Sequence, residues 1–180
     1  MDGKIVKFDV KQEVYNSVNT PSNRLRYQKF KIAALNEAME VISEATCTTS
    51  ETEAITQVSE FIGSQQAHCY LINHDAHGYA KFVIDEHSIK ALETGLHKIK
   101  SSLDRKQIYN ILYDMTISGK VPGVRVLEII DNNTKHAETE DVIVEVYRSI
   151  LPLTIKKFVP AETLLPTFDN LFKSTFDLLC

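Results

Sequence analysis

The residues best suited to bind a metal lie near the middle of the chain. Cys69, His74 and His77 are close in sequence, and the two histidines form a His-x-x-His pair. Thiolate and imidazole are the ligands that zinc prefers, and a structural zinc site usually has four of them. The pattern lacks a clear fourth ligand, and a turn tolerates polar residues freely. We interpret the histidines as residues of a solvated turn and predict no metal and no cofactor.

A second candidate for chemistry is the acid and base set Asp85, Glu86 and His87. Adjacent side chains at the start of a helix point in different directions, and N-capping alone explains Asp85. Serine, histidine and aspartate are all present, but no nucleophile-elbow sequence accompanies them. Cys180 is interpreted as a small apolar residue rather than a reactive thiol. With no convergent acid, base and nucleophile, the sequence predicts no catalytic residue.

The segment around these residues divides the chain into two parts. Tyr70–Asn73 is predicted to be a strand, 74–78 a glycine-containing turn and 79–84 a second strand, which together make a hairpin. Three apolar residues share one face of the second strand: Ala80, Phe82 and Ile84. Asp85 then caps a helix, so this segment ends a β region and begins a helical one.

Upstream of this segment, apolar and polar residues alternate as they do in half-buried strands. The stretches 4–10 and 26–35 show this alternation, and 40–46 and 53–58 are further candidates. The residues predicted to face inward are Val6, Phe8 and Val10 in the first stretch, and Phe30, Ile32 and Ala34 in the second. Short strands joined by short loops favour an antiparallel β-sandwich over β-α-β units.

Downstream, the apolar residues recur at helical spacing. Three successive stripes are Ile89, Leu92, Leu96 and Ile99; Ile108, Ile111, Leu112 and Met115; and Val124, Leu127 and Ile130. Gly119 is expected to end the second helix as a left-handed cap, and Pro122 suits the first turn of the third. Helices joined by such short loops are typical of the stacked pairs of an α-solenoid.

Two more helices are predicted after these three. Thr139 is expected to cap the fourth, which either ends at Pro152 or continues to Lys157. The last helix follows Pro166 and carries an apolar stripe made of Phe168, Leu171, Phe172, Phe176 and Leu179. Such a stripe is more often core than a binding face. If no helix follows Cys180 to cover it, however, this stripe is our candidate partner interface.

Bulk properties narrow the class of protein. The 180 residues carry a formal net charge of -4, which argues against a dedicated nucleic-acid binder. No apolar run is long enough to span a bilayer, and the N-terminus lacks a secretory signal. Three cysteines without paired spacing suggest reduced thiols, so we expect a cytoplasmic protein with no membrane partner. The expected fold is α+β, with an antiparallel β-sandwich over 1–85 and an α-helical, solenoid-like array over 86–180.

Several short motifs resemble one known family. The matching residues are Tyr70–Asn73, Asp75, His77–Lys81, Ile84–Glu86 and Ser88, continued by Leu92, Leu96, Ile99, Arg105, Ile111–Met115 and Leu127–Ile129, with Arg24–Ile32 upstream. They resemble the aminopeptidase N (puromycin-sensitive type) family of zinc metallopeptidases. The resemblance implies a small β-sandwich joined to a C-terminal helical domain, in enzymes that trim N-terminal residues from peptides.

The chain departs from that family at the residues that perform catalysis. It contains neither the His-Glu-x-x-His zinc motif nor the Gly-Ala-Met-Glu-Asn stretch that holds the substrate's amino terminus. No catalytic residue can therefore be transferred. We expect a non-catalytic C-terminal module that packs against, or regulates access to, a catalytic portion absent from this chain. The alternative is a stand-alone interaction protein that uses the same sandwich and helices as a docking platform in a larger assembly.

Overall fold

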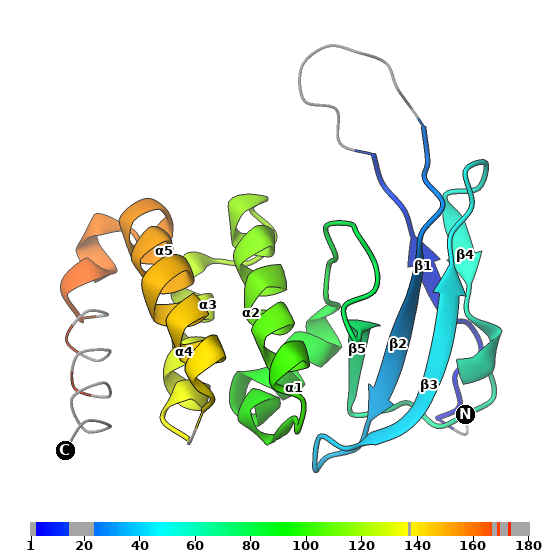
Figure 1. Ribbon diagram of the computed structural model, residues 1–180, viewed down its shortest axis with the longest axis horizontal. Coiled ribbons are helices and arrows are strands. Elements are labelled where there is room, and N and C mark those ends of the chain that lie inside the picture. The colour runs from blue at the N-terminus through cyan, green and yellow to red at the C-terminus, as the bar shows by residue number, and fades with distance from the viewer. Residues whose placement is uncertain (1–2, 15–23, 137, 167–168, 170–172, 174–180) are drawn as a thin grey trace.

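The computed structural model describes residues 3–14, 24–136, 138–166, 169 and 173, and it has the predicted α+β class. Two small antiparallel sheets occupy one end of the molecule, and the helices follow along its long axis in chain order (Figure 1). No helix in these described ranges combines the length and apolar character needed to cross a bilayer.

The larger sheet has three strands in the order β3 (Val41–Thr48), β2 (Lys29–Leu35) and β5 (Cys69–His74). Both neighbours of the central strand β2 are antiparallel to it. The predicted inward face of β2 is buried, namely Phe30, Ile32 and Ala34. Ala33 and Leu35 on its opposite face are buried as well. This strand is therefore covered on both sides, which the alternation alone did not indicate.

The smaller sheet pairs β1 (Asp9–Lys11) with β4 (Ile55–Gln57). The predicted strand from residue 4 is too long, and the prediction that Val6 faces inward is wrong, since its side chain is 86% exposed. Before β1 the chain contacts a different segment, where the Ile5 N–H donates to the Ser64 carbonyl. A short 3-10 helix, Ser59–Phe61, precedes that segment.

The predicted hairpin after β5 is wrong, because residues 79–84 form no strand. The Asn73 side chain closes the turn instead, accepting from the Gly78 N–H at 2.6 Å and donating to the Gly78 carbonyl at 3.2 Å. The chain then crosses toward the helices, and Phe82 and Ile84 are buried in side-chain packing. The Phe82 ring lies edge-on to that of Phe30, so these apolar residues serve the core without pairing as a strand.

Helix α1 (Glu86–Gly95) begins as predicted, with Asp85 as its N-cap. The Asp85 carboxylate accepts from the Ser88 N–H at 2.9 Å and from the Ser88 hydroxyl at 2.6 Å. The same hydroxyl oxygen accepts from the Tyr70 N–H of β5 at 2.9 Å. One serine therefore fixes the start of the helical part against the edge of the sheet.

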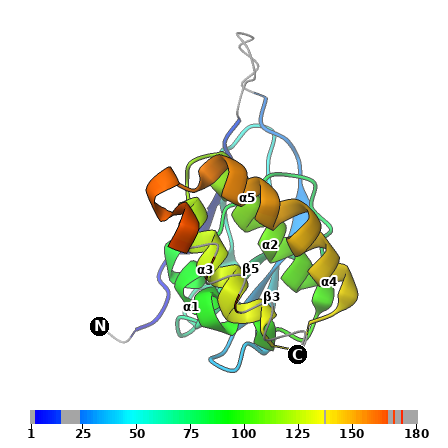
Figure 2. The same cartoon turned by 90° about the vertical axis from the view of Figure 1, so that its left-hand side faces the viewer.

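The next helices are α2 (Ser102–Ile117) and α3 (Gly123–Thr134), with a 3-10 turn, Leu96–Lys98, after α1. The predicted stripes are buried except for Val124, which is half-buried. Gly119 has a φ of 70°, as expected of a left-handed cap, whereas Pro122 is the N-cap of α3 rather than part of its first turn. Figure 2 views the molecule from the helical end, with the strands behind the helices.

Pro152 does not end the fourth helix. Helix α4 (Glu140–Glu145) continues through a π-helical turn, Val146–Ile150, into α5 (Leu151–Phe158). Thr139 occupies the N-cap position of α4, but its side chain makes no capping hydrogen bond. Proline has no N–H and clashes with the carbonyl four residues earlier in a regular helix. The wider π turn directly before α5 accommodates the missing N–H and the ring of Pro152, so the helix continues. Of the two alternatives left by the sequence, continuation of the helix is correct.

The core is continuous between the strands and the helices. Buried apolar side chains from β2, β5, α1, α2, α3 and α4 belong to one cluster. Helix α1 packs on β5, α3 packs on α1 and α2, and α5 packs on α3. The two sequence regions therefore share packing at their junction, and this junction positions the polar cluster described next.

Candidate functional site

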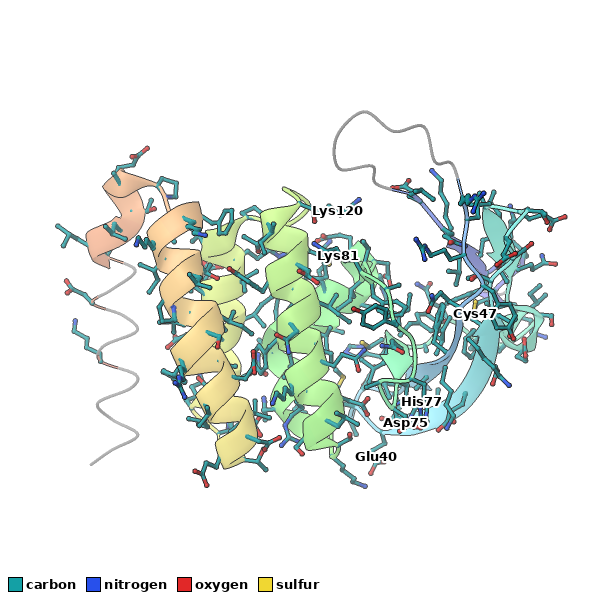
Figure 3. The ribbon with its side chains drawn as sticks, turned by 45° about the horizontal axis from the view of Figure 1, so that its top comes forward. Glu40, Cys47, Asp75, His77, Lys81 and Lys120 are labelled. Carbon is teal, nitrogen blue, oxygen red and sulfur yellow. The ribbon has the colours of Figure 1, made fainter. Side chains whose placement is uncertain are left out.

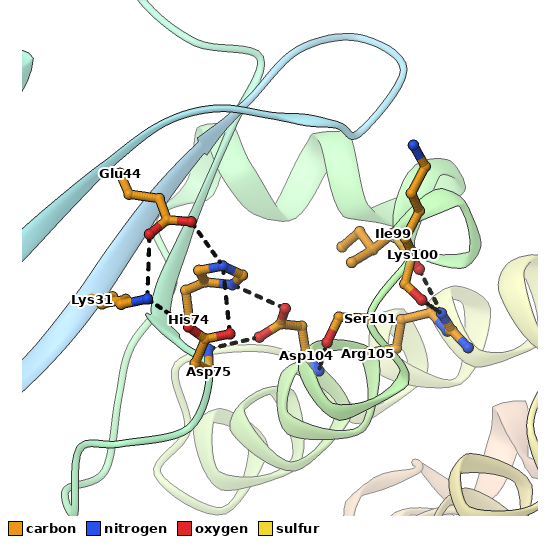
Figure 4. A network of polar contacts seen from close by, with 9 residues as sticks. All are labelled: Lys31, Glu44, His74, Asp75, Ile99, Lys100, Ser101, Asp104 and Arg105. Atoms are coloured by element: carbon orange, nitrogen blue, oxygen red, sulfur yellow. Dashed lines mark hydrogen bonds and ion pairs between the residues drawn. The ribbon is translucent and has the colours of Figure 1, made fainter.

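A cluster of five charged or titratable side chains lies where the sheet meets α2 (Figure 4). His74 ends β5, and Asp75 follows it in the turn. Asp104 comes from the first turn of α2, while Lys31 and Glu44 come from β2 and β3. Four separate elements thus contribute to one site.

His74 and Asp104 form the buried centre of this cluster. His74 Nδ1 lies 2.9 Å from Asp104 Oδ2, and the two side chains are only 11% and 4% exposed. Neither atom has a hydrogen-bond partner of acceptable geometry, although they are close to one another. The other carboxylate oxygen, Asp104 Oδ1, accepts from the Asp75 N–H at 3.1 Å. The contact is therefore close in distance but not aligned as a hydrogen bond.

The opposite edge of the imidazole faces the other carboxylates. His74 Nε2 lies 3.4 Å from Glu44 Oε1 and 3.7 Å from Asp75 Oδ1. Lys31 Nζ lies 2.7 Å from Asp75 Oδ2 and 3.4 Å from Glu44 Oε2. The hydrogen bond from Lys31 lowers the pKa of Asp75, which keeps this carboxyl group ionised at neutral pH.

The backbone holds the two aspartates in place. Ser101 caps α2 by accepting from the Asp104 N–H at 3.1 Å, which fixes Asp104 in the first turn. Asp75 and Ala76 have φ values of 65° and 58°, a left-handed conformation that is costly for residues other than glycine. The Asp104 carboxylate stabilises this turn by accepting the Asp75 N–H.

The metal candidates of the sequence are not brought together. Cys69 is buried against the Ser88 carbonyl, whereas His77 is exposed on the loop beside Asp75 (Figure 3). A solvated turn describes His77 correctly, but it is wrong for His74, which points into the protein. In the described part of the chain, the group with potential ligand atoms within 4.8 Å of one another is His74, Asp75 and Asp104.

Asp104 was missed because it lies far from His74 in the sequence. Its only local signal is Ser101 three residues earlier, a spacing typical of a helix cap rather than a binding site. The sequence does not indicate that the start of α2 faces the end of β5. Sequence reasoning could have found Asp104 only by predicting that packing.

The residues of the second sequence candidate contact different partners. Asp85 caps α1, and Glu86 pairs with Arg125 at 2.8 Å. His87 Nε2 lies 2.9 Å from the Ala67 carbonyl oxygen. Their side chains therefore point in different directions, as the helix geometry predicts.

Both described cysteines are expected to resist alkylation in the native protein. Burial raises the pKa of Cys47 to about 11 and that of Cys69 to about 12, so almost no thiolate exists at pH 8. Iodoacetamide at pH 8, followed by peptide mass spectrometry, should leave both residues unmodified in buffer and label both in 6 M guanidinium.

The same burial predicts a loss of stability in alkali. The folded-state pKa values of Cys47 and Cys69 lie above the ordinary thiol pKa of 9.0, so the unfolded chain loses these protons first. The contribution of these protonated thiols to the free energy of unfolding is therefore complete below pH 9. It decreases as the pH rises toward the pKa values of the folded protein. Rapid native labelling at pH 8 would contradict the burial of these thiols.

The predicted partner-interface residues Phe168, Leu171, Phe172, Phe176 and Leu179 lie outside the described residues. Neither a comparison with models of known protein families nor a search of curated proteins found a match to this chain.

Proposed function

We propose that this chain is a non-catalytic module related to the C-terminal part of aminopeptidase N-type enzymes. In this proposal it packs against, or regulates access to, a catalytic portion supplied outside this sequence. The two small sheets then correspond to the family's β-sandwich, and the helices to the first members of its solenoid-like domain. The support is the element order, with strands before helices and the most family-like residues, 70–88, at their junction.

The observation that carries this proposal is the packing at the junction. Ser88 joins α1 to β5, and apolar side chains from both parts form one core cluster. A module that restricts access to a neighbouring site must hold its parts in a fixed orientation, and shared packing achieves this. The cluster around His74 adds polar contacts at the same boundary.

The surface is consistent with a docking role. Large apolar side chains are exposed at several described positions, among them Val6, Ile42, Tyr79 and Val83. One surface hollow is lined mainly by the charged side chains of Lys106, Glu140, Asp141 and Glu145. The second candidate, a stand-alone interaction protein, uses these same surfaces to join an unrelated assembly.

The first test is mass spectrometry of the endogenous protein, immunoprecipitated through an epitope within residues 90–150. The proposal expects peptides with a His-Glu-x-x-His motif, either upstream in the same polypeptide or in a co-purifying subunit. A 20.4 kDa protein that arrives only with an unrelated assembly would support the stand-alone alternative. Peptidase activity of the purified chain, retained after re-purification, would contradict a non-catalytic role.

The candidate interface can be tested in the same assay. The triple variant Phe168→Ser, Phe172→Ser and Leu179→Ser should lose the co-purifying catalytic subunit if this stripe forms the contact. Leu165→Ser is the matched control, because it removes a neighbouring exposed leucine outside the stripe. Equal recovery of the subunit with both variants would exclude the stripe as the interface.

A further inference from the structure

We propose that His74, Asp75 and Asp104 bind a divalent transition-metal ion that joins the end of β5 to the start of α2. This inference concerns a ligand of the junction and does not depend on the proposed function. It rests on the orientation of the imidazole, on the buried Asp104 Oδ2, which lies close to His74 Nδ1 without an aligned hydrogen bond, and on the carboxylates of the cluster.

The neighbours of the His74 imidazole indicate which of its two nitrogens carries the proton. His74 Nε2 lies 3.4 Å from Glu44 Oε1, so a proton on Nε2 is favoured by this carboxylate. In the neutral ring Nδ1 is then a lone pair, and it faces Asp104 Oδ2 at 2.9 Å. Two electron-rich atoms this close in a buried site repel one another unless a positive charge lies against both. Metal-bound histidines typically have this arrangement, in which a carboxylate orients the second ring nitrogen.

The geometry of the pair fits a shared ion better than a shared proton. The Nδ1–Oδ2 distance is 2.9 Å, yet the atoms do not meet the alignment of a hydrogen bond. Two donors that each lie ~2.1 Å from one ion, at the right angle of octahedral coordination, are ~3.0 Å apart and need not point at each other. Asp104 is almost fully buried, and its Oδ2 has no other partner.

The third ligand is available from Asp75. Lys31 holds Asp75 Oδ2, while Oδ1 lies on the side of the imidazole. Asp75 has a potential ligand atom within 4.8 Å of those of His74 and Asp104. Its side chain is 41% exposed, so solvent can reach this side of the cluster and supply water ligands. Lys31 therefore positions Asp75 and does not block the pair.

The charge of the cluster specifies a divalent ion. Glu44, Asp75 and Asp104 contribute three negative charges, and the Lys31 ammonium balances one of them. The cluster therefore holds more carboxylate groups than ammonium groups. One imidazole with two carboxylates in an octahedral arrangement suits Mn²⁺, whereas Mg²⁺ and Ca²⁺ prefer sites made of oxygen alone. A bound ion would stabilise the junction according to its concentration and affinity.

The test uses Mn²⁺ as the probe on chelator-treated, full-length protein. Paramagnetic broadening in two-dimensional ¹H–¹⁵N NMR spectra should affect the amides of 74–76 and 102–105 first, and Zn²⁺ should reverse it. Asp104→Asn keeps an acceptor for the Asp75 N–H but removes the anionic ligand, so Mn²⁺ affinity should fall at least about tenfold. Asp114→Asn makes the same change elsewhere on α2, where Asp114 pairs with exposed Lys81, and should leave the affinity unchanged.

Three results would overturn the proposal that these residues bind a metal ion. Absence of local broadening at millimolar Mn²⁺ would overturn the proposal and leave a proton as the charge between His74 and Asp104. Broadening centred on the acidic helix α4, Glu140–Glu145, would place Mn²⁺ on the surface and overturn it as well. Equal affinities of Asp104→Asn and Asp114→Asn for Mn²⁺ would also reject it, and the wild-type broadening pattern is informative even if Asp104→Asn folds poorly.

Discussion

Glu138→Gln is expected to lower the free energy of unfolding by about 3 kcal/mol, because it leaves a buried arginine charge without its partner. Arg105 and Glu138 have side chains that are 8% and 2% exposed. Arg105 Nε donates to the two carboxylate oxygens of Glu138 at 3.0 and 2.8 Å, and Arg105 Nη2 donates to one of them. Urea denaturation monitored by circular dichroism measures the loss.

The large expected effect arises because Arg105 also donates hydrogen bonds to backbone carbonyls. Its Nη1 donates to the carbonyls of Ile99 and Lys100 in the turn before α2. The carboxylate of Glu138 thus orients a guanidinium that also satisfies the turn, and it raises the pKa of Arg105 through the shared hydrogen bonds. A neutral glutamine keeps the shape but not the charge, so the arginine must rearrange or remain unpaired.

The control is Glu145→Gln, which removes a partly exposed partner of Lys106 at 3.7 Å. Surface pairs of this kind contribute less than about 1 kcal/mol, because water screens both charges. A second variant, Arg105→Met with Glu138→Leu, removes both charges and should be more stable than Glu138→Gln alone. Equal losses from Glu138→Gln and Glu145→Gln would show that burial does not strengthen the first pair.

The helical half was the more predictable part of the fold. Leu92, Leu96 and Leu112 were predicted to be buried from spacing alone, and all three are fully buried. A helix has one period, and its apolar face is buried whichever element covers it. The caps at Asp85 and Gly119 depend only on local backbone geometry and were also predicted correctly.

The strands and the polar cluster were less predictable because they depend on distant partners. Alternation identified the inward face of β2, but it could not show that Ile5 pairs with Ser64 and leaves Val6 exposed. It also could not distinguish a second hairpin strand from the extended segment 79–84, since both bury Phe82 and Ile84. A candidate site assembled from four elements has no compact sequence motif.

Asn133→Ala is expected to lower the free energy of unfolding by about 3 kcal/mol, because one buried amide satisfies several backbone groups. Asn133 lies on α3 and is 1% exposed. Its Nδ2 donates to the carbonyls of Leu92, Glu93 and Ile129 at 3.2, 3.0 and 2.8 Å. Its Oδ1 accepts from the His97 N–H at 3.0 Å, so the amide joins α3 to the end of α1. Urea denaturation measures this loss as well.

The matched control is Asn132→Ala, because Asn132 is the preceding residue of α3 and is only half-buried. The control should change stability by less than about 1 kcal/mol, since a partly exposed amide exchanges its partners for water. Asn133→Asp separates the two halves of the amide: it keeps the acceptor for His97 but directs a carboxylate at two or more carbonyl oxygens. It should therefore be at least as destabilising as Asn133→Ala at pH 7, and a milder effect would show that the acceptor alone holds the turn.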